Sequence, residues 1–424
     1  MEVEARPRAL SARGSGRWQH VLRFLVIMGP GIITANVDND AGGITTYSLA
    51  GARYGYALVW TLVPITIALV VVQEMCARMG AVTGKGLADL IRENFGVRLT
   101  FYVMVLLLLA DLGNTVAEFA GVAASLEIFG LSRYATVPPA ALFVWWLVVY
   151  GSYRRVEKVF LAACLFYLAY VASGVLAAPG WSHVLGASVA PRARVDAAYL
   201  TMLVGLVGTT IAPWMQFYQQ SAIVEKGVRA EDYPYSRLDV VSGCIFTDVV
   251  AFFIIVACAA TLHAGGVAIE TAADAAQALR PLAGAYCAAL FAFGLFNASL
   301  FSASVLPLAT AYSVCEALGW ETGVNKRMRE APHFYGLYTG LIVLGAAIVL
   351  VPGIPLIPVM YLSQVANGVL LPVVLVFMLL LINRRDLMGQ YTNGTAMNAA
   401  AWVTVIVTSG LSLYLAATVF FGTT

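Results

Sequence analysis

The chain contains a series of apolar runs, each long enough to cross a lipid bilayer as a helix. A membrane helix needs about 20 predominantly apolar residues. Of the 424 residues, 60% are hydrophobic and only 11% are charged, whereas soluble domains carry about 25% charged residues. The sequence therefore predicts an all-α integral membrane protein. We expect about eleven membrane helices, at 24–51, 57–77, 101–128, 137–151, 158–178, 198–224, 239–262, 282–316, 334–352, 355–382 and 397–421.

The distribution of Lys and Arg predicts how the chain is oriented. If the N-terminus is cytoplasmic, 20 of the 25 Lys and Arg residues lie in cytoplasmic segments and 5 lie outside. Cytoplasmic loops are normally the richer in positive charge. We therefore expect a multi-pass protein of the plasma membrane, with the N-terminus in the cytoplasm and the C-terminus outside. The expected parts are a tail (1–23), a core (24–390) with two five-helix halves (24–178 and 198–382), and a C-terminal segment with one additional helix (391–424).

Acidic residues interrupt the first expected helix. Asp38 and Asp40 lie on either side of Asn39, and Gly42 and Gly43 weaken the helix just beyond them. A charge at the bilayer centre costs a few kcal/mol or more. An unwound turn here would expose carbonyl oxygens beside a carboxylate, and such hard oxygen ligands suit a cation. The acids could also cap the second half of the helix, and the two roles are compatible.

The sixth expected helix carries a second interruption, between Gly208 and Pro213. Proline removes a helix hydrogen bond and frees carbonyl groups before it, and Thr209 adds a hydroxyl oxygen. Taken alone, this segment is explained equally well by an ordinary proline kink. Paired interruptions at matching positions, however, indicate an inverted-repeat transporter with its binding site at the membrane midplane. We therefore expect helices 1 and 6 to be broken.

Further polar residues lie inside expected helices. Asp111 and Glu118 share one face of the third helix, where they could line an ion or proton path or pair with other polar groups. Gln364 in the tenth helix is a candidate ligand, although a polar contact between helices explains it as well. Asp239 and Asp248 in the seventh helix have the same two explanations, and Asp239 could simply lie at the cytoplasmic end.

Motifs of soluble enzymes are missing from the sequence. The four histidines all lie in loops or at helix ends, so none is available as a midplane ligand or proton relay. No phosphate-binding loop, dinucleotide fingerprint, zinc-protease motif or nucleophile elbow occurs. We expect no enzymatic activity, no cofactor, no nucleic-acid partner and no obligate protein partner. The expected partners are the lipid bilayer and a transported ion.

Short motifs along residues 24–390 resemble those of the Nramp family of metal transporters, and they occur in the same order. They are Gly29-Pro30-Gly31, Asp40-Ala41-Gly42-Gly43, Ala50-Gly51-Ala52-Arg53-Tyr54-Gly55-Tyr56, Gln73 to Arg78, Gly80-Ala81-Val82-Thr83-Gly84-Lys85, Ala117-Glu118-Phe119-Ala120-Gly121, Ser363-Gln364 and Arg384-Arg385-Asp386-Leu387-Met388-Gly389. The resemblance implies a LeuT-like fold, divalent metal transport and alternating access. It also points to Asp40, rather than Asp38, as the principal metal ligand.

Four positions depart from the manganese and iron transporters of that family. Where those proteins have Asn, Met, His and Asp, this chain has Gly43, Ala212, Trp214 and Thr115, respectively. Glu118 in the third helix is retained. This set of changes resembles the Nramp-related magnesium transporter branch.

The departures agree with a hydrated, hard cation. A thioether favours transition metals over magnesium, and Ala212 removes it, although the sulfur of Met215 could approach if the helix register slips. Each lost side chain could make room for one or two waters at about 30 Å³ each, and Mg²⁺ usually keeps several waters. The resemblance therefore implies Mg²⁺, and also Mn²⁺, as the transported substrate. The expected metal site is Asp38, Asp40, Gly43, Thr209, Ala212 and Gln364, and the expected lining or pathway residues are Asn39, Asp111, Thr115, Glu118 and Trp214.

Proton coupling is expected to be weak or absent, because Thr115 and Trp214 replace two titratable groups of the family. Two alternatives stay open. The first is a proton-coupled Mn²⁺ or Fe²⁺ transporter of the usual Nramp type. The second is a sodium-coupled transporter of organic solutes on the same fold, which Asp38 and Asp40 disfavour for anionic substrates. A membrane enzyme or a non-transporting sensor has little support.

Overall fold

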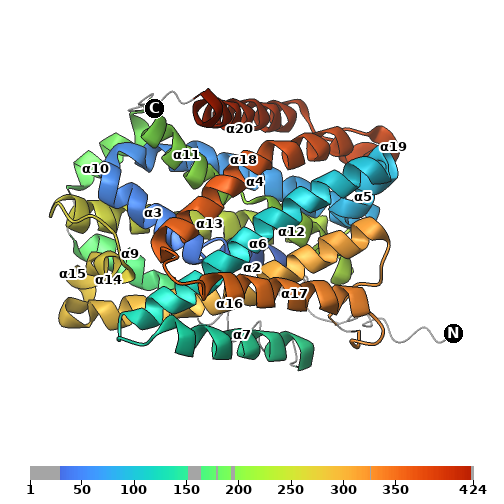
Figure 1. Cartoon of the computed structure of the whole chain (residues 1–424). Coiled ribbons are helices and arrows are strands. Elements are labelled where there is room, and N and C mark those ends of the chain that lie inside the picture. The colour runs from blue at the N-terminus through green and yellow to red at the C-terminus, as the bar shows by residue number, and fades with distance from the viewer. Residues whose placement is uncertain (1–28, 151–163, 178–179, 192–195, 325, 422–424) are drawn as a thin grey trace, which may run out of the picture.

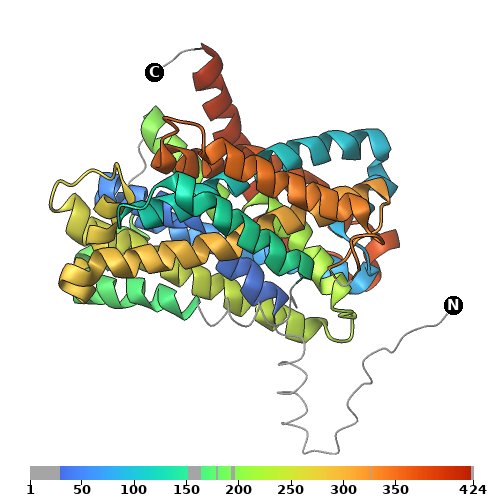
Figure 2. The same ribbon diagram turned by 60° about the horizontal axis from the view of Figure 1, so that its bottom comes forward.

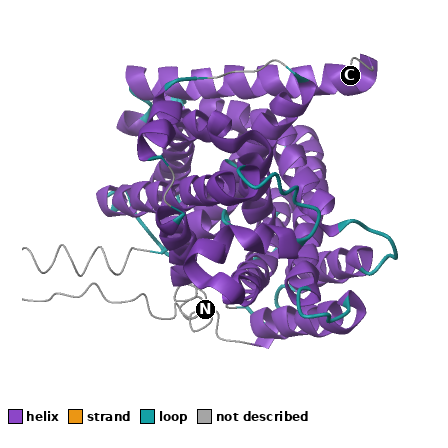
Figure 3. Cartoon of the chain, turned by 90° about the vertical axis from the view of Figure 1, so that its left-hand side faces the viewer, coloured by secondary structure: helices purple, strands orange, loops and turns teal. Residues whose placement is uncertain are grey.

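The computed structural model describes residues 29–150, 164–177, 180–191, 196–324 and 326–421. Within these ranges every regular element is helical and no strand occurs (Figure 3), which confirms the all-α prediction. Short 3₁₀ segments such as η1 (Gly55–Leu58) and η2 (Cys164–Tyr167) join some of the helices. The α-helices are α2 (Pro30–Val37), α3 (Ala41–Tyr54), α4 (Val59–Thr83), α5 (Leu87–Phe95), α6 (Val97–Glu127), α7 (Arg133–Tyr150), α9 (Leu168–Leu176), α10 (Trp181–Val189), α11 (Ala197–Thr210), α12 (Pro213–Glu225), α13 (Tyr233–Cys258), α14 (Ala272–Ala276), α15 (Arg280–Ala283), α16 (Cys287–Leu318), α17 (Pro332–Val349), α18 (Leu356–Ile382), α19 (Arg385–Met388) and α20 (Thr395–Phe421).

Eight helical segments among the described residues are long and apolar enough to cross a bilayer, and α9 with α10 adds a ninth if these two count as one bent span. One of the eight, Ala41–Thr83, has 43 residues. It would measure roughly 65 Å as a straight helix, about twice the 30 Å of the apolar core. Its backbone turns at Gly55, where φ is 56°, so α4 is one crossing and α3 belongs to another, together with α2. Each of the eleven expected segments contains a helix; the segments 24–51, 137–151 and 158–178 extend partly outside the described residues.

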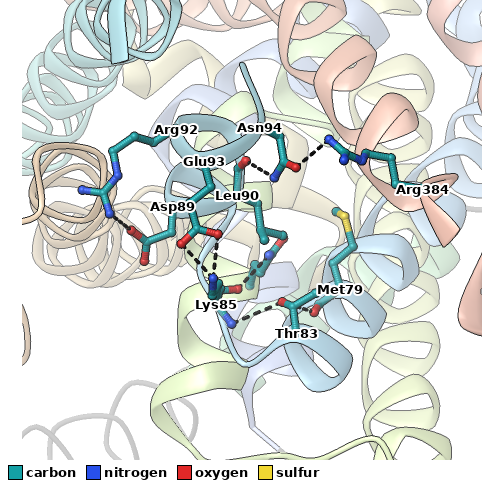
Figure 4. A network of polar contacts seen from close by, with 10 residues as sticks. Met79, Thr83, Lys85, Asp89, Leu90, Arg92, Glu93, Asn94 and Arg384 are labelled. Atoms are coloured by element: carbon teal, nitrogen blue, oxygen red, sulfur yellow. Dashed lines mark hydrogen bonds and ion pairs between the residues drawn. The ribbon is translucent and has the colours of Figure 1, made fainter. Parts of the chain in front are cut away.

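Two segments expected as loops contain helices of nine residues each, α5 and α10, and two others contain the shorter helices α14 and α19. All four are too short to satisfy the length that identifies membrane helices. In α5, Leu87, Leu90 and Ile91 are buried. Its polar face carries a network of contacts (Figure 4), so this helix lies on the surface of the bundle rather than across it. The contacts are Lys85 Nζ to Glu93 Oε2 at 2.6 Å, Arg92 Nη2 to Asp89 Oδ1 at 3.1 Å, and Arg384 Nη1 to Asn94 Oδ1 at 2.7 Å.

The first broken helix, α2 plus α3, lies along α13 in parallel. Three contacts mark this arrangement: the Gly31 N–H donates to Asp239 Oδ2 at 2.7 Å, Asn39 Nδ2 donates to Thr247 Oγ1 at 2.6 Å, and a Cβ on Gly51 would lie 2.5 Å from Ile255 O. Asp239 also accepts from the Gly29 N–H at 3.2 Å. It therefore holds the start of α2 and is not simply a residue at a helix end. α13 thus fixes the path of the chain on both sides of the first break.

The second broken helix, α11 plus α12, lies at the centre of the bundle. In its most apolar stretch of 18 residues, 78% of the residues are buried, whereas in the corresponding stretch of α20 only 22% are buried. Figures 1 and 2 show α20 along the outer edge, as expected of an additional helix. α11 crosses α18 with the backbones in direct contact: a Cβ on Gly208 would overlap Gln364 O and Gly368 N and would lie 2.7 Å from Gly368 Cα. This crossing places Gln364 beside the helix breaks.

Candidate metal site at the helix breaks

The first break has the predicted location and consists of residues 38–40. α2 ends at Val37 and α3 begins at Ala41. Asp40 occupies the N-cap of α3 with extended backbone dihedral angles (φ −72°, ψ −173°), and its Oδ1 accepts from the Gly43 N–H at 2.6 Å. The expectation that an acid caps the second half-helix therefore applies to Asp40 and not to Asp38. The second carboxyl oxygen of Asp40 is not used by this cap.

The second break also has the predicted location. α11 ends at Thr210 and α12 begins at Pro213, which fills the first helical position and needs no hydrogen bond there. The last carbonyls of α11 lack partners within their helix, and the C-terminal end of a helix favours a cation. The carbonyl of Ala212 accepts from the Met215 N–H at 3.1 Å and from the Gln216 side-chain amide at 2.6 Å. Both of its lone pairs are used, so Ala212 contributes space at the break.

Oxygen atoms from both breaks converge on Gly43. A Cβ built there would overlap the Asp38 carbonyl oxygen and would lie 3.1 Å from Thr209 Oγ1 and 3.4 Å from Asp40 Oδ1. The Thr209 hydroxyl is buried and has no hydrogen-bond partner in the part of the chain that the structure describes. The missing side chain at Gly43 therefore leaves room for oxygen ligands, and the Asp38 carbonyl occupies part of the room that was expected for water.

Gln364 of α18 contacts the same turn, because a Cβ on Gly42 would overlap its amide nitrogen. Its Oε1 accepts from Asn367 Nδ2 at 3.0 Å, which leaves one lone pair on that oxygen. Asn367 and Asn114 exchange two amide hydrogen bonds, at 2.9 and 3.1 Å. Asn114 also donates to Asp111 Oδ1 at 3.2 Å. A continuous chain of polar side chains thus joins Gln364 to α6.

The acids of α6 have different surroundings. Asp111 accepts from Thr310 Oγ1 at 2.6 Å, and Thr115 donates to the Asp111 carbonyl at 2.7 Å, so both belong to the polar chain and not to the break. Glu118 is fully buried. It lies beside the Asp40 carboxyl, and its Oε2 accepts a long hydrogen bond (3.4 Å) from the Ala41 N–H. Its Oε1 has no partner, so Glu118 is the α6 acid that faces the first break.

The remaining expected lining residues pack into the bundle. Asn39 donates to Thr247 on α13, and its backbone carbonyl accepts from the Tyr167 hydroxyl at 2.8 Å. Trp214 is 2% exposed, and its ring lies 6.2 Å from that of Tyr218. Both residues therefore support the breaks. The Asn39 side-chain amide oxygen has no hydrogen-bond partner among the described residues.

Two residues near the first break were not among the expected site residues. The side chain of Tyr47 in α3 donates to Thr210 in α11, and Asp248 in α13 is a charged neighbour of Asp38. Asp248 has a sequence signal, a charge in mid-helix, but only the register of α13 shows what it faces. The described residues contain no group of three or more His, Cys, Asp or Glu side chains that could hold a metal. A metal bound here would therefore need backbone and hydroxyl oxygens.

Known proteins resemble this chain over nearly its whole length. The family described as "Natural resistance-associated macrophage protein-like", Nramp, matches residues 31–418. A protein of Deinococcus radiodurans named divalent metal cation transporter MntH is 28% identical, over 97% of this chain and 94% of its own. A protein of Ralstonia nicotianae with the same name is 29% identical, over 94% and 91%.

Solved structures share the fold. The manganese transporter of Eremococcus coleocola superposes with a TM-score of 0.79 at 23% identity and covers 97% of this chain and 90% of its own. The nucleobase-cation-symport-1 family transporter MHP1 superposes with a TM-score of 0.60 at 16% identity, over 92% and 91%. Transporters of two families thus share this architecture, which confirms the expected LeuT-like fold. Because the family match spans nearly all of the described chain, this protein belongs to the Nramp family.

Proposed function

We propose that this protein transports divalent metal cations across a membrane by alternating access. The observation that carries the proposal is the convergence of the Asp38 carbonyl, the Thr209 hydroxyl and the Asp40 carboxylate on Gly43, where the two broken helices meet. Hard oxygen ligands of this kind suit Mg²⁺, Ca²⁺ and Mn²⁺. The names of the full-length relatives, divalent metal cation transporters, support the same substrate class.

Within that class we propose Mg²⁺ as the preferred substrate, with Mn²⁺ also accepted. The preference rests on ligand chemistry: Ala212 offers no thioether at the second break, and the oxygens around Gly43 are hard donors. Mg²⁺ keeps several waters when it binds, and the unpartnered Thr209 hydroxyl could bind such a water or the ion itself. The competing candidate is a proton-coupled Mn²⁺ or Fe²⁺ transporter, which the names of the relatives support equally.

Competition between ions tests the preference. In proteoliposomes that contain the native chain, Mg²⁺ at millimolar concentration is expected to suppress Mn²⁺ uptake, because both ions would use the same oxygen ligands. Ala212→Met is the matched variant. It adds a thioether, which favours transition metals, so Mg²⁺ should compete less well against Mn²⁺ in this variant. Mn²⁺ uptake by the native chain that is unaffected by Mg²⁺ would instead support the competing candidate.

We also propose that transport needs little or no proton coupling. Thr115 is committed to the Asp111 carbonyl and Trp214 is packed in the bundle, so neither can carry a proton. An inside-negative potential of 100 mV supplies about 4.6 kcal/mol for a divalent ion. That is roughly a thousandfold gradient at 1.4 kcal/mol per decade, so uncoupled uptake would be productive.

A pH-sensitive dye inside the vesicles tests this directly. With a potassium diffusion potential as the only driving force, Mg²⁺ uptake is expected without acidification of the lumen. An ionophore that carries protons should leave the initial rate unchanged once the potential is clamped. Acidification that starts with Mg²⁺ addition and scales with the amount of Mg²⁺ entering would show coupling and contradict the proposal.

The remaining proposals concern placement. The excess of Lys and Arg in one set of loops supports a plasma-membrane protein with a cytoplasmic N-terminus and an external C-terminus; antibody access to a C-terminal tag on intact cells tests this. The proposed parts are the tail (1–23), the two halves of the core (24–178 and 198–382) and the C-terminal segment (391–424). The peripheral position of α20 supports the last of these.

A further inference from the structure

Asp38 and Asp248 bring two carboxyl groups without partners together beside the first break. Asp38 is 2% exposed and Asp248 is 5% exposed. Neither carboxyl oxygen of either residue has a hydrogen-bond partner within the described part of the chain. Among the charged groups near Asp38, Asp248 acts on it most strongly, ahead of Asp40. Both acids are therefore buried, unpartnered among the described residues and close enough for their charges to interact.

Hydrogen bonds of the neighbouring residues fix this arrangement. Asn39, next to Asp38, donates to Thr247, next to Asp248, at 2.6 Å. The hydroxyl of Thr66 also lies beside Asp248, but it donates its hydrogen to the Leu62 carbonyl at 2.7 Å. Apart from this hydroxyl, which is directed to Leu62, no described residue offers a donor to either carboxyl group, and the backbone around them is held in place.

An additional oxygen lies at the same place. The hydroxyl of Thr210 donates to the Leu206 carbonyl at 2.9 Å, so in the 2.7 Å contact between Tyr47 and Thr210 the phenol is the donor. Asp38 and Asp248 are both charged neighbours of Tyr47. With its hydrogen directed to Thr210, the phenol oxygen offers lone pairs only. The cluster therefore consists of two carboxyl groups and a third oxygen acceptor, and neither carboxyl group has a hydrogen-bond partner among the described residues.

A divalent cation matches this cluster in charge and in ligand type. Two buried carboxylates repel each other and each costs several kcal/mol to desolvate. A monovalent ion would leave one of them uncompensated, whereas a divalent ion balances both. We propose that Asp38 and Asp248, with the Tyr47 hydroxyl, hold a second divalent cation of the oxygen-seeking class, next to the transported ion. This inference rests on the proposed function, which would supply the ion.

Asp38 connects the two sites. Its backbone carbonyl lies at Gly43 in the proposed transport site, and its carboxyl group is a charged neighbour of Asp248. An ion held by the carboxyl group would restrict the backbone of the same residue. Binding at one site therefore changes the affinity at the other, and the effect is reciprocal.

Counting bound ions tests the second site. The full chain in lipid nanodiscs is dialysed against saturating Mn²⁺ and the bound metal is measured per chain. We expect two Mn²⁺ ions for the native chain and one for Asp248→Asn and for Asp38→Asn, which keep the volume but lose the charge. The matched control is Asp196→Asn, which changes an exposed acid at the start of α11 and should bind two. The melting temperature of each variant identifies any that has not folded.

Each outcome has one meaning. A single ion in the native chain, or two ions in both folded variants, would overturn the second site and leave Asp38 and Asp248 as acids that share protons. Two ions in the native chain and one in the variants would support it. The count does not use transport, so two bound ions without uptake would contradict the proposed function alone. No bound ion at all would contradict both.

Discussion

Asp40→Asn is expected to lose nearly all metal uptake while folding as well as the native chain. Asn and Asp cap helices about equally well, so the hydrogen bond from the Gly43 N–H to Asp40 Oδ1 can be kept. The negative charge at the proposed transport site is removed. Removing one partner of a desolvated charge pair costs about 2 to 5 kcal/mol, which is about 30-fold or more in affinity. Initial uptake of Mg²⁺ and Mn²⁺ at subsaturating concentration measures the loss.

Two further variants separate the charge from the cap. Asp40→Ala removes both and should also lower stability by about 1 kcal/mol, as expected for a lost N-cap. Asp196→Asn makes the same exchange at the N-cap of α11, where the side chain accepts from the Tyr199 N–H at 2.9 Å, and should leave uptake unchanged. If Asp40→Asn transports like the native chain, Asp40 is a helix cap and no ligand.

Gly208→Ala is expected to prevent correct packing of the bundle. The added methyl group would overlap the backbone oxygen of Gln364 and the backbone nitrogen of Gly368. Overpacking that moves side chains costs typically 1 to 3 kcal/mol, and here two helix backbones must separate. The better helix propensity of Ala returns only about 1 kcal/mol, so at the upper end of that cost we expect a net loss of about 2 kcal/mol. Melting temperature and the monodisperse fraction after extraction into detergent measure this.

The control is the same exchange at a glycine with space around it. A Cβ on Gly113 in α6 or on Gly340 in α17 would meet nothing within 4 Å, so these variants should be as stable as the native chain or more stable. Native stability of Gly208→Ala would mean that α11 and α18 can move apart freely. In that case the position of Gln364 beside Gly42 would not depend on the crossing.

The breaks themselves could be predicted from the sequence, because they require residues that a membrane helix normally avoids. Asp38 and Asp40 lie two residues apart among apolar residues, and Pro213 follows Gly208 and two threonines. A proline alone does not break a helix of this chain, because Pro64, Pro307 and Pro372 lie inside continuous helices. The cap on α3 could also be anticipated, because the spacing of Asp40 and Gly43 is that of an N-cap and its third helical residue. These signals are local, so one stretch of sequence contains them.

Contacts between distant segments could not be predicted in this way. The register of α13 against α2 and α3 decides that Asp248 faces Asp38, and no local pattern encodes it. The close approach of the Asp38 carbonyl oxygen to Gly43, which leaves no room for a Cβ there, depends on the dihedral angles of the break. Likewise, the two lone pairs of the Ala212 carbonyl are used by Met215 and Gln216, which sequence alone does not reveal. α5 and α10 were not predicted, because only apolar runs of about 20 residues were taken as helices.

Asn39 is held from two sides, by Thr247 through its side chain and by Tyr167 through its carbonyl. The middle of the first break is therefore held in place, and α2 and α3 extend from it on either side. We expect α2 and α3 to move separately during transport while Asn39 stays in place. An ion arriving from one side and an ion about to leave on the other would then be surrounded by the same oxygens. The barrier between the states open to either side of the membrane would lie in α2 and α3. A substitution that changes gating therefore need not alter ion selectivity.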